Sequence, residues 1–575
     1  SDGIAWDSAE HLLIEGDNLE VLKVIQKSYA GKIRVIYIDP PYNTGKDLVY
    51  VDDYTESLAS YLKYSGQLDA RGQRLTNNSE SDGRYHSKWL SMMYPRLMLA
   101  RDLLQDDGLL FVSIDRHEDD NLRKICGELF GEENLVAWIA NVNNPKGRSD
   151  DKYVATAHES LAIYKKREAS LGGWEPEEKI TKRYNKVASG GVPYREIDLR
   201  KTGDADRRID RPNMFYFFLY NELSRELRVT RDVAVPEGWI QIRPMKDDGS
   251  DGRWRWALET SADRLSRLVA KFMPVRQRWG VFEMDLLDED ERIKPTSVWS
   301  MKEVNSERGS EQFIELGFDK EIFPRPKPVG LIRRILDIAT SDGDTILDFF
   351  GGSGVTAQAV LEANAADGKR RKFILVQLPE PTRSARPDGS FAETAAWAAG
   401  YATIAEVTKE RVRRALGRVN TSENGDRREG FRVYRLADSN LVPWATSQGS
   451  DSDSIAAQLR MNVERIRPDR SDDDLATEIL LKLGFELTAP CEVRTVAGKT
   501  VRAYSGVLYL CFDAFTDADV DAFVDGLGTL HHEVTGGHPT PSTVIFRDDM
   551  LGKDSVKTNL GTGLEHRGLG TIRSL

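Results

Sequence analysis

The stretch IYIDPPYN, residues 36–43, begins as a strand and stops abruptly in an acid, two prolines and an aromatic residue. The apolar residues at its start are rich in β-branched side chains and too few for a helix, so they predict a buried strand. Pro40 and Pro41 supply no backbone N–H, and the strand must therefore end there. Open α/β sheets bind ligands at the carboxyl ends of their strands, so a ligand is expected beside Asp39, the Pro40 carbonyl and Tyr42.

An acid, a carbonyl and an aromatic ring suit a flat heterocycle that carries an amino group. The Asp39 carboxylate and the Pro40 carbonyl can accept its two N–H bonds, and the Tyr42 ring can stack on its face. Asp-Pro-Pro-Tyr resembles the catalytic signature of DNA methyltransferases that methylate amino groups, which implies catalytic roles for Asp39, Pro40, Pro41 and Tyr42. Asp in first position resembles the adenine-specific members, because cytosine-specific relatives usually carry Ser there. Taken alone, a strand that ends in a Pro-rich turn explains the tetrapeptide equally well.

The composition indicates several globular domains. At 575 residues the chain exceeds a single core, and 40% hydrophobic with 30% charged residues is typical of soluble proteins. No apolar run approaches the roughly 20 residues of a membrane helix and no signal peptide opens the chain, so we expect a cytoplasmic protein without a membrane partner. The three cysteines form no CxxC pair, which predicts neither disulfides nor a zinc site. A net charge of −12 means that any nucleic-acid site must be a local basic patch.

A second strand–turn–helix pattern carries a glycine loop. Residues 345–348 predict a strand, residues 349–354 (FFGGSG) a turn and residues 355–365 a helix. Such glycines let the backbone wrap around a ligand at a helix N-terminus, although the pattern equally suits a dinucleotide. In the methyltransferase family the FxGxG form wraps the methionine moiety of S-adenosylmethionine. The resemblance implies that the cofactor is held here by Asp348, Phe350, Gly352, Ser353 and Gly354. The family usually has Pro after the Asp and Thr after the last Gly, where this chain has Phe349 and Val355.

The resemblance implies further cofactor contacts outside the loop. Asp17 lies in a Gly-Asp turn that resembles the family's turn beside the cofactor adenine, although a simple helix cap explains it as well. Lys327 matches the family's lysine–proline element, and Asp39 is expected to touch the cofactor as well as the target base. Where the family commonly has an acid that binds the cofactor ribose, this chain has Gln377, with Glu380 three residues later. Both stay open as the ribose contact.

The order of the motifs predicts the domain organisation. The target-amine motif comes first and the cofactor loop last, which resembles the circularly permuted β class of methyltransferases. We therefore predict an α/β, Rossmann-like, S-adenosylmethionine-dependent methyltransferase fold that is split between residues 1–165 and 321–428. A target recognition domain at 166–320 is inserted between these halves, and an α+β association domain at 429–575 follows.

The predicted insertion is basic within an acidic chain. From Lys165 to Gly280 there are 25 Lys and Arg against 18 Asp and Glu, with five tryptophans among them. Basic residues with aromatics suit a surface that neutralises phosphates and stacks on bases, and an ordinary globular insert is the alternative. The densest cluster, DGRWRW at residues 251–256, predicts DNA contacts from Arg253, Trp254 and Arg255.

The C-terminal third contains no obvious catalytic motif, but two of its segments resemble those of a known family. Residues 429–444 and 543–559 resemble segments of the modification (Mod) subunit of type III restriction-modification systems. The resemblance implies a homodimer and a separate ATP-dependent restriction (Res) subunit, and the Gly-Lys-Thr at 498–500 lacks the earlier glycine of a Walker A loop. The polar residues 75–83 and 448–454 predict a loop and a linker.

Three C-terminal histidines, His531, His532 and His538, suggest a metal site by their number alone. They lack cysteines or acids at a matching spacing, so no metal site is predicted.

Together the motifs predict a site-specific DNA adenine-N6 methyltransferase, the modification subunit of a type III system. It would transfer the methyl group of S-adenosylmethionine to an adenine flipped out of double-stranded DNA, because a base inside the duplex cannot reach such a pocket. A solitary adenine methyltransferase and a cytosine-N4 methyltransferase remain as alternatives. An RNA or protein methyltransferase would not explain the permuted order with its basic insertion, and a nucleotide-binding regulator would not need Asp-Pro-Pro-Tyr.

Overall fold

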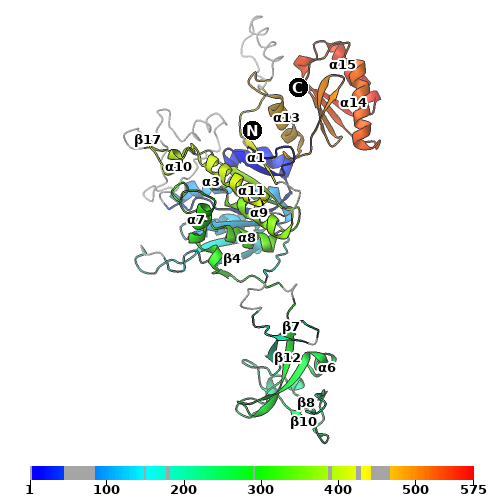
Figure 1. Cartoon of the computed structure of the whole chain (residues 1–575). Helices are drawn as coiled ribbons and strands as arrows, with labels where there is room; N and C mark the ends of the chain where they lie inside the picture. The colour runs from blue at the N-terminus through cyan, green and yellow to red at the C-terminus, as the bar shows by residue number, and fades with distance from the viewer. Residues whose placement is uncertain are drawn as a thin grey trace. The chain divides into compact units, whose positions relative to one another are not determined.

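The computed structural model divides into two compact units (Figure 1). One unit comprises Ser1–Gly172 with Thr296–Leu575, and the other comprises Gly173–Pro295. The structure describes residues 3–44, 85–147, 151–175, 182–188, 190–288, 292–385, 391–421, 429–441 and 466–575. The loop predicted at 75–83 and the linker predicted at 448–454 lie outside these residues.

A nine-stranded sheet in the first unit combines strands from both predicted halves of the catalytic domain with β13 and β18, which come from the predicted recognition and association domains. Its strand order is β13-β4-β5-β3-β2-β14-β15-β1-β18. β2 pairs in parallel with β14, with Ile36 opposite Leu347, so the two motif-bearing strands are direct neighbours. The strands are β1 (His11–Glu15), β2 (Ile33–Ile38), β3 (Leu104–Ile114), β4 (Leu135–Asn141), β5 (Glu159–Lys165), β13 (Val298–Trp299), β14 (Thr345–Asp348), β15 (Lys372–Gln377) and β18 (Phe431–Arg435).

Helices pack against this sheet in two groups. One group is α1 (Asn18–Tyr29), α3 (Tyr85–Leu103) and α4 (Asp119–Phe130), and the other is α7 (Ser306–Glu315), α8 (Val329–Ala339), α9 (Val355–Asp367) and α11 (Ile404–Thr421). Ile36 and Ile38 of β2 lie in the core that the first group covers, while Val35 and Tyr37, which alternate with them along the strand, are buried as well. Burial on both faces explains why this strand reads as a continuous apolar run. A two-stranded ribbon, β16 (Ser384–Ala385) with β17 (Phe391–Ala392), and the short helix α10 (Ala395–Ala398) follow β15.

The C-terminal region adds a five-stranded sheet to the first unit. Its order is β19-β20-β21-β22-β23, and α13 (Asp472–Leu483), α14 (Val520–Thr535) and α15 (Asp554–His566) pack on it. Leu487 ties this region to the catalytic sheet, because its N–H donates to the Tyr29 hydroxyl at 3.0 Å and its carbonyl accepts from Arg432 at 2.7 Å. The strands are β19 (Glu492–Val496), β20 (Lys499–Tyr504), β21 (Leu508–Cys511), β22 (Thr543–Phe546) and β23 (Thr571–Ser574).

Two general features concern the described residues alone. Every helix among them is too short or too polar to span a bilayer. Within the described ranges no group of His, Cys, Asp and Glu is arranged to hold a metal ion. His531 instead lies 2.9 Å from the hydroxyl of Tyr509 through its Nδ1.

The second unit consists of antiparallel strands. A three-stranded sheet has the order β10-β8-β9 and a four-stranded sheet the order β11-β12-β7-β6. The unit spans fewer residues than the recognition domain predicted at 166–320, because β13 and α7 belong to the first unit. The elements are β6 (Lys186–Val187), β7 (Pro193–Asp198), β8 (Phe217–Tyr220), β9 (Leu227–Thr230), β10 (Ile240–Ile242), α6 (Leu258–Asp263), β11 (Leu268–Met273) and β12 (Arg278–Leu286).

The core of the second unit corrects two of the predicted DNA contacts. Trp254 is 1% exposed, packs edge-to-face on Phe218 and donates its indole N–H to a backbone carbonyl. Arg253 is 7% exposed and also donates to backbone carbonyls. The prediction that these two side chains face DNA is therefore wrong, because the large tryptophan ring fills the core and the arginine satisfies carbonyls beside it. Arg255 remains partly exposed and pairs with Glu283 at 3.1 Å.

Candidate active site

The turn after β2 is held in one conformation by contacts on both sides of Tyr42. The Tyr42 hydroxyl donates to Oδ1 of Asp39 at 2.8 Å. Trp89 donates its indole N–H to the Pro41 carbonyl at 2.8 Å, and Asn43, which has a left-handed φ of 57°, donates its amide to the buried Glu118. Trp89 engages the carbonyl of Pro41 and not that of Pro40, which is the carbonyl predicted to accept from the target amine.

Two residues far apart in the sequence complete a polar cluster around Asp39. Glu159 is the first residue of β5, and Lys327 lies just before α8. The Lys327 ammonium donates to both carboxylate oxygens of Glu159 at 2.7 Å and to the Tyr42 hydroxyl at 2.5 Å, and it lies 3.4 Å from Oδ1 of Asp39. Asn141 of β4 donates to Glu159 at 3.1 Å. The cluster therefore joins the two predicted halves of the domain, and it places Lys327 beside the predicted amine acceptor.

Exposure separates the two acids of this cluster. The side chain of Asp39 is 29% exposed, whereas that of Glu159 is 4% exposed. Asp39 is therefore the more accessible of the two carboxylates to a ligand.

The cluster also shifts the protonation of its members. Burial raises the pKa of Asp39, and Glu159 raises it further, while the Lys327 ammonium and the Tyr42 hydroxyl lower it. Burial lowers the pKa of Lys327, but the carboxylates of Asp39 and Glu159 outweigh this and the pKa is raised. Burial and the same two carboxylates raise the pKa of Tyr42. Near neutral pH Lys327 is therefore a cation and Tyr42 a neutral hydrogen-bond donor.

The glycine loop lies at the carboxyl end of β14, next to this cluster in the sheet. Gly352 and Gly354 have φ of 52° and 85°, in the left-handed region that favours glycine. The side-chain oxygen of Gln377, at the end of β15, accepts from the Gly352 N–H at 2.6 Å. The hydroxyl of Thr408 on α11 donates to the Gly352 carbonyl at 2.6 Å. The loop is thus fastened from both sides.

Two of the predicted cofactor contacts are buried supports of this loop. Asp348 is 2% exposed and accepts from the Phe350 N–H at 3.0 Å and from the Thr356 hydroxyl at 2.6 Å. Burial raises the pKa of Asp348 to about 7, against the effect of these hydrogen bonds. Ser353 is 3% exposed, and its hydroxyl oxygen accepts from the buried Arg411 at 2.5 Å. Both side chains therefore act on a ligand through the loop that they hold.

The loop fits the cofactor that the resemblance implies. A Cβ added to Gly352 would meet only Phe323 and Phe350, both at 3.7 Å, so this face of the loop leaves room for a ligand. Gly354 is the N-cap of α9 and has no side chain with which to cap it. The first N–H groups of α9 are therefore suited to an anionic group such as the carboxylate of methionine.

The remaining predicted cofactor residues have internal partners. Asp17 caps α1 by accepting from the Glu20 N–H at 3.1 Å and pairs with the buried Arg96 at 3.3 Å, so the simple capping role is present and the adenine contact stays a prediction. Gln377 uses its oxygen on the glycine loop and its amide N–H on the Leu378 carbonyl. Gln377 and Glu380 therefore both stay predictions as the ribose contact.

Sequence reasoning missed Glu159. Glu159 is the first residue of the apolar strand β5, and no motif in the sequence assigned this acid a role. An acid directly before an apolar strand is a signal, because a buried carboxylate needs a charged or hydrogen-bonding partner. Only the antiparallel pairing of β5 with β3 places the start of β5 at the edge where β2 ends.

The arrangement is that of a DNA methyltransferase, and comparisons with known proteins agree. Residues 33–378 match the DNA methylase family (N6_N4_Mtase), and the chain belongs to this family. It is 30% identical over 526 residues to the type III restriction-modification enzyme EcoPI Mod subunit of Escherichia phage P1, covering 90% of this chain and 79% of that protein. It is also 30% identical over 539 residues to the EcoP15I Mod subunit of Escherichia coli, covering 90% and 78%.

Within this family the chain is a modification subunit of a type III restriction-modification system, and its cofactor is S-adenosylmethionine. Both predictions are confirmed, as is the Rossmann-like methyltransferase fold. The type II methyltransferase M.KpnI of Klebsiella pneumoniae is likewise 30% identical, over 406 residues that cover 71% of this chain and 88% of that protein. The similarity therefore extends to a type II methyltransferase.

We predict that Gly352→Val raises the dissociation constant for S-adenosylmethionine at least tenfold. The left-handed backbone costs a branched residue about 1–2 kcal/mol, and the new side chain would occupy the open face of the loop. Isothermal calorimetry without DNA measures the constant.

Gly343→Val is the matched control. Gly343 has a φ of 80° and open space around it, but it lies before β14, at the opposite end of the same strand. The Gly343→Val variant should lose about as much stability as Gly352→Val and keep its affinity for the cofactor. Equal loss of affinity in both variants would mean that the effect is general destabilisation.

Proposed function

We propose that this methyltransferase modifies N6 of an adenine flipped out of double-stranded DNA. The observation that carries the proposal is the accessible Asp39 carboxylate, fixed by Tyr42 and Lys327 at the end of β2. An adenine amino group presents two N–H bonds, which suit Asp39 and the Pro40 carbonyl, and the Tyr42 ring offers a stacking face. Asp rather than Ser at position 39 favours adenine over cytosine N4.

Asp39 and the Pro40 carbonyl would act on the nucleophile. The lone pair of the amino nitrogen is delocalised into the purine ring, and acceptors on both N–H bonds favour the pyramidal nitrogen that attacks. S-adenosylmethionine, when bound, supplies the methyl group on a sulfonium, so one N–C bond forms as one S–C bond breaks. The nitrogen then loses one proton, and the raised pKa of Asp39 suits this carboxylate to receive it.

We predict that Asp39→Ala lowers the single-turnover methylation rate by roughly 10²-fold or more, because an acceptor that acts in the transition state is lost. Cofactor affinity, measured by calorimetry, should change little, since the glycine loop does not depend on Asp39. Methylation-sensitive sequencing of host DNA identifies the base and the site beforehand. A near-normal rate in this variant would show that another group holds the amine.

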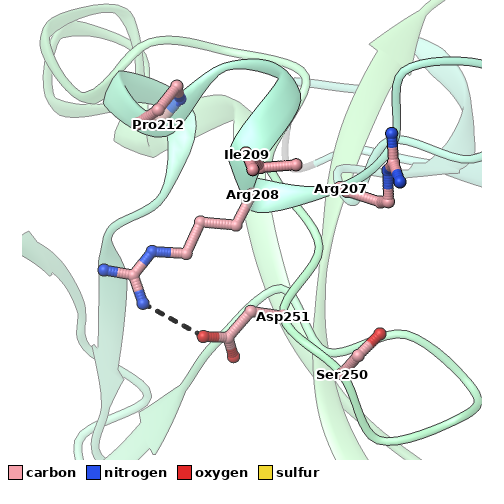
Figure 2. Close-up of a pocket in the computed structure, with 6 residues that line it drawn as sticks. All are labelled: Arg207, Arg208, Ile209, Pro212, Ser250 and Asp251. Carbon is pink, nitrogen blue, oxygen red and sulfur yellow. Dashed lines mark hydrogen bonds and ion pairs between the residues drawn. The ribbon is translucent and has the colours of Figure 1, made fainter.

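We propose that the unit Gly173–Pro295 recognises the DNA sequence, through a hollow on its surface. The hollow has a volume of about 430 Å³ and is lined by Arg207, Arg208, Ile209, Pro212, Ser250 and Asp251 (Figure 2). Asp251 opens the cluster at 251–256 that the sequence singled out. We therefore propose that the exposed Arg207 and Arg208 beside Asp251 contact DNA, in place of the buried Arg253 and Trp254.

The chemistry of the hollow suits DNA. Arg208 donates to Asp251 at 3.1 Å, as Figure 2 shows, and its guanidinium lies over the ring of Phe215 at 4.0 Å. Arg243 holds the same carboxylate at 3.0 Å. Arginines oriented by an acid and a ring present fixed donors to a base edge or a phosphate, and the 77% exposed Ile209 adds apolar contact.

We predict that Arg208→Ala weakens binding of DNA that carries the methylated site by about 1–3 kcal/mol at fixed salt. Arg228→Ala is a matched control, because Arg228 is also exposed, ion-paired and stacked on a ring, Trp239, but does not line the hollow. The control should change binding by less than about 0.5 kcal/mol. Fluorescence anisotropy measures both, and equal losses would remove the hollow from the interface.

We propose that the chain forms a homodimer and docks a separate ATP-dependent restriction subunit. The similarity to the EcoPI and EcoP15I Mod subunits supports this, and it extends over 90% of the chain.

We predict that light scattering of the purified chain gives about twice 64.8 kDa. Co-purification with the product of a neighbouring helicase-like gene should then yield a larger complex. A monodisperse monomer that methylates at full rate would favour the solitary alternative.

A further inference from the structure

Glu159 and Lys327 form a buried ion pair directly behind the acid that is to bind the target amine. We propose that this pair positions Asp39 and sets its charge during methyl transfer, with Glu159 acting through Lys327 as a positioning residue. No motif assigns Glu159 a role, and Lys327 was expected at the cofactor. The inference rests on the proposed function of Asp39.

The distances show how the ammonium is shared. Lys327 contacts both oxygens of Glu159 at 2.7 Å but lies 3.4 Å from Oδ1 of Asp39. Because Glu159 is 4% exposed and also held by Asn141, it fixes the ammonium in place. The Lys327 ammonium therefore stabilises the negative charge of Asp39 from a fixed position, but it is shared with Glu159 and does not fully neutralise that charge.

The Tyr42 hydroxyl links Lys327 to Asp39 through two hydrogen bonds. Its oxygen accepts from Lys327 at 2.5 Å, so its own proton must point to a carboxylate. Oδ1 of Asp39, at 2.8 Å, is closer than Glu159, at 3.1 Å. Lys327 and Tyr42 thus both engage Oδ1, and within the described part of the chain Oδ2 has no partner. Oδ2 is the oxygen that we assign to the incoming N–H.

The charges around Asp39 make both members of the pair necessary. The groups that face Asp39 are Lys327 before α8, Glu159 on β5, Tyr37 on β2, Tyr42 in the turn and Asp348 on β14. Lys327, the one cation among these groups, lowers the pKa of Asp39 and so favours its ionised form. The second carboxylate keeps Asp39 basic enough to stabilise the positive charge that develops on the attacking nitrogen.

If the ion pair only stabilised the packing of β5 against the segment before α8, its variants would have different effects. Breaking such an ion pair from either side would lower stability and activity in the same way. The electrostatic role predicts opposite effects on Asp39, because Glu159→Gln removes a negative charge and Lys327→Met removes a positive one.

The test is the pH dependence of the single-turnover methylation rate, with saturating cofactor and DNA. The rate depends on ionised Asp39, so it falls on the acidic side as this group protonates. Lys327→Met should move this acidic limb to higher pH by about 1–3 pH units, and Glu159→Gln should move it to lower pH and reduce the plateau rate about tenfold or more. The double variant should have its limb between the two.

Two readouts separate this role from folding and from cofactor binding. Lys327→Arg and Glu159→Asp keep the charges and should leave the limb near its original pH even if the rate falls. Calorimetry should give an unchanged cofactor affinity for Glu159→Gln. Shifts in the same direction for Lys327→Met and Glu159→Gln, or no shift in either, would overturn the proposal.

The same experiments distinguish failure of the inference from failure of the proposed function. If sequencing finds methylated cytosine, the adenine assignment fails, while the opposite shifts still support the pair. If Asp39→Ala methylates normally, the role of Asp39 fails, and the inference fails with it.

Discussion

The parallel pairing of β2 with β14 is the interaction on which the site depends. Ile36 lies opposite Leu347, so the strand that ends in Asp39 and the strand that ends in the glycine loop finish side by side. Parallel strands direct their carboxyl ends to one edge of a sheet, and the acceptor for the target amine and the cofactor loop are thereby brought together. β14 follows β2 after more than three hundred residues of sequence, and the second unit lies between them in the chain.

Irregular backbone at this edge is held by buried polar side chains. Gln377 and Thr408 bind Gly352, Asp348 binds Phe350, and Glu118 holds Asn43 after the Pro-Pro turn. A buried polar group without a partner costs free energy, so these contacts both satisfy the groups and restrict the loops. The glycine loop and the turn are thus shaped before a ligand arrives, and less ordering remains to be paid on binding.

The predicted catalytic residues and the proposed recognition surface lie on different units. The nine-stranded sheet carries the acid, the lysine and the cofactor loop, whereas the antiparallel unit carries exposed arginines around Asp251. The basic character of the inserted sequence is spread over many ion pairs, such as those of Arg208 and Arg243 with Asp251. Orientation of arginines by neighbouring acids, more than net charge, therefore distinguishes this surface.

The sequence by itself determined the strands, the two motifs and their order, because apolar runs, prolines and glycines restrict the backbone locally. β2, β14 and α9 lie where these patterns predict them. Tertiary structure alone decided that Glu159 joins Asp39, since this requires β5 to run antiparallel to β3. It also decided that Lys327 lies at the amine acceptor, and that Arg253 and Trp254 are buried while Arg207 and Arg208 are exposed. A local pattern does not reveal which face of an irregular segment is covered, because that depends on residues distant in the chain.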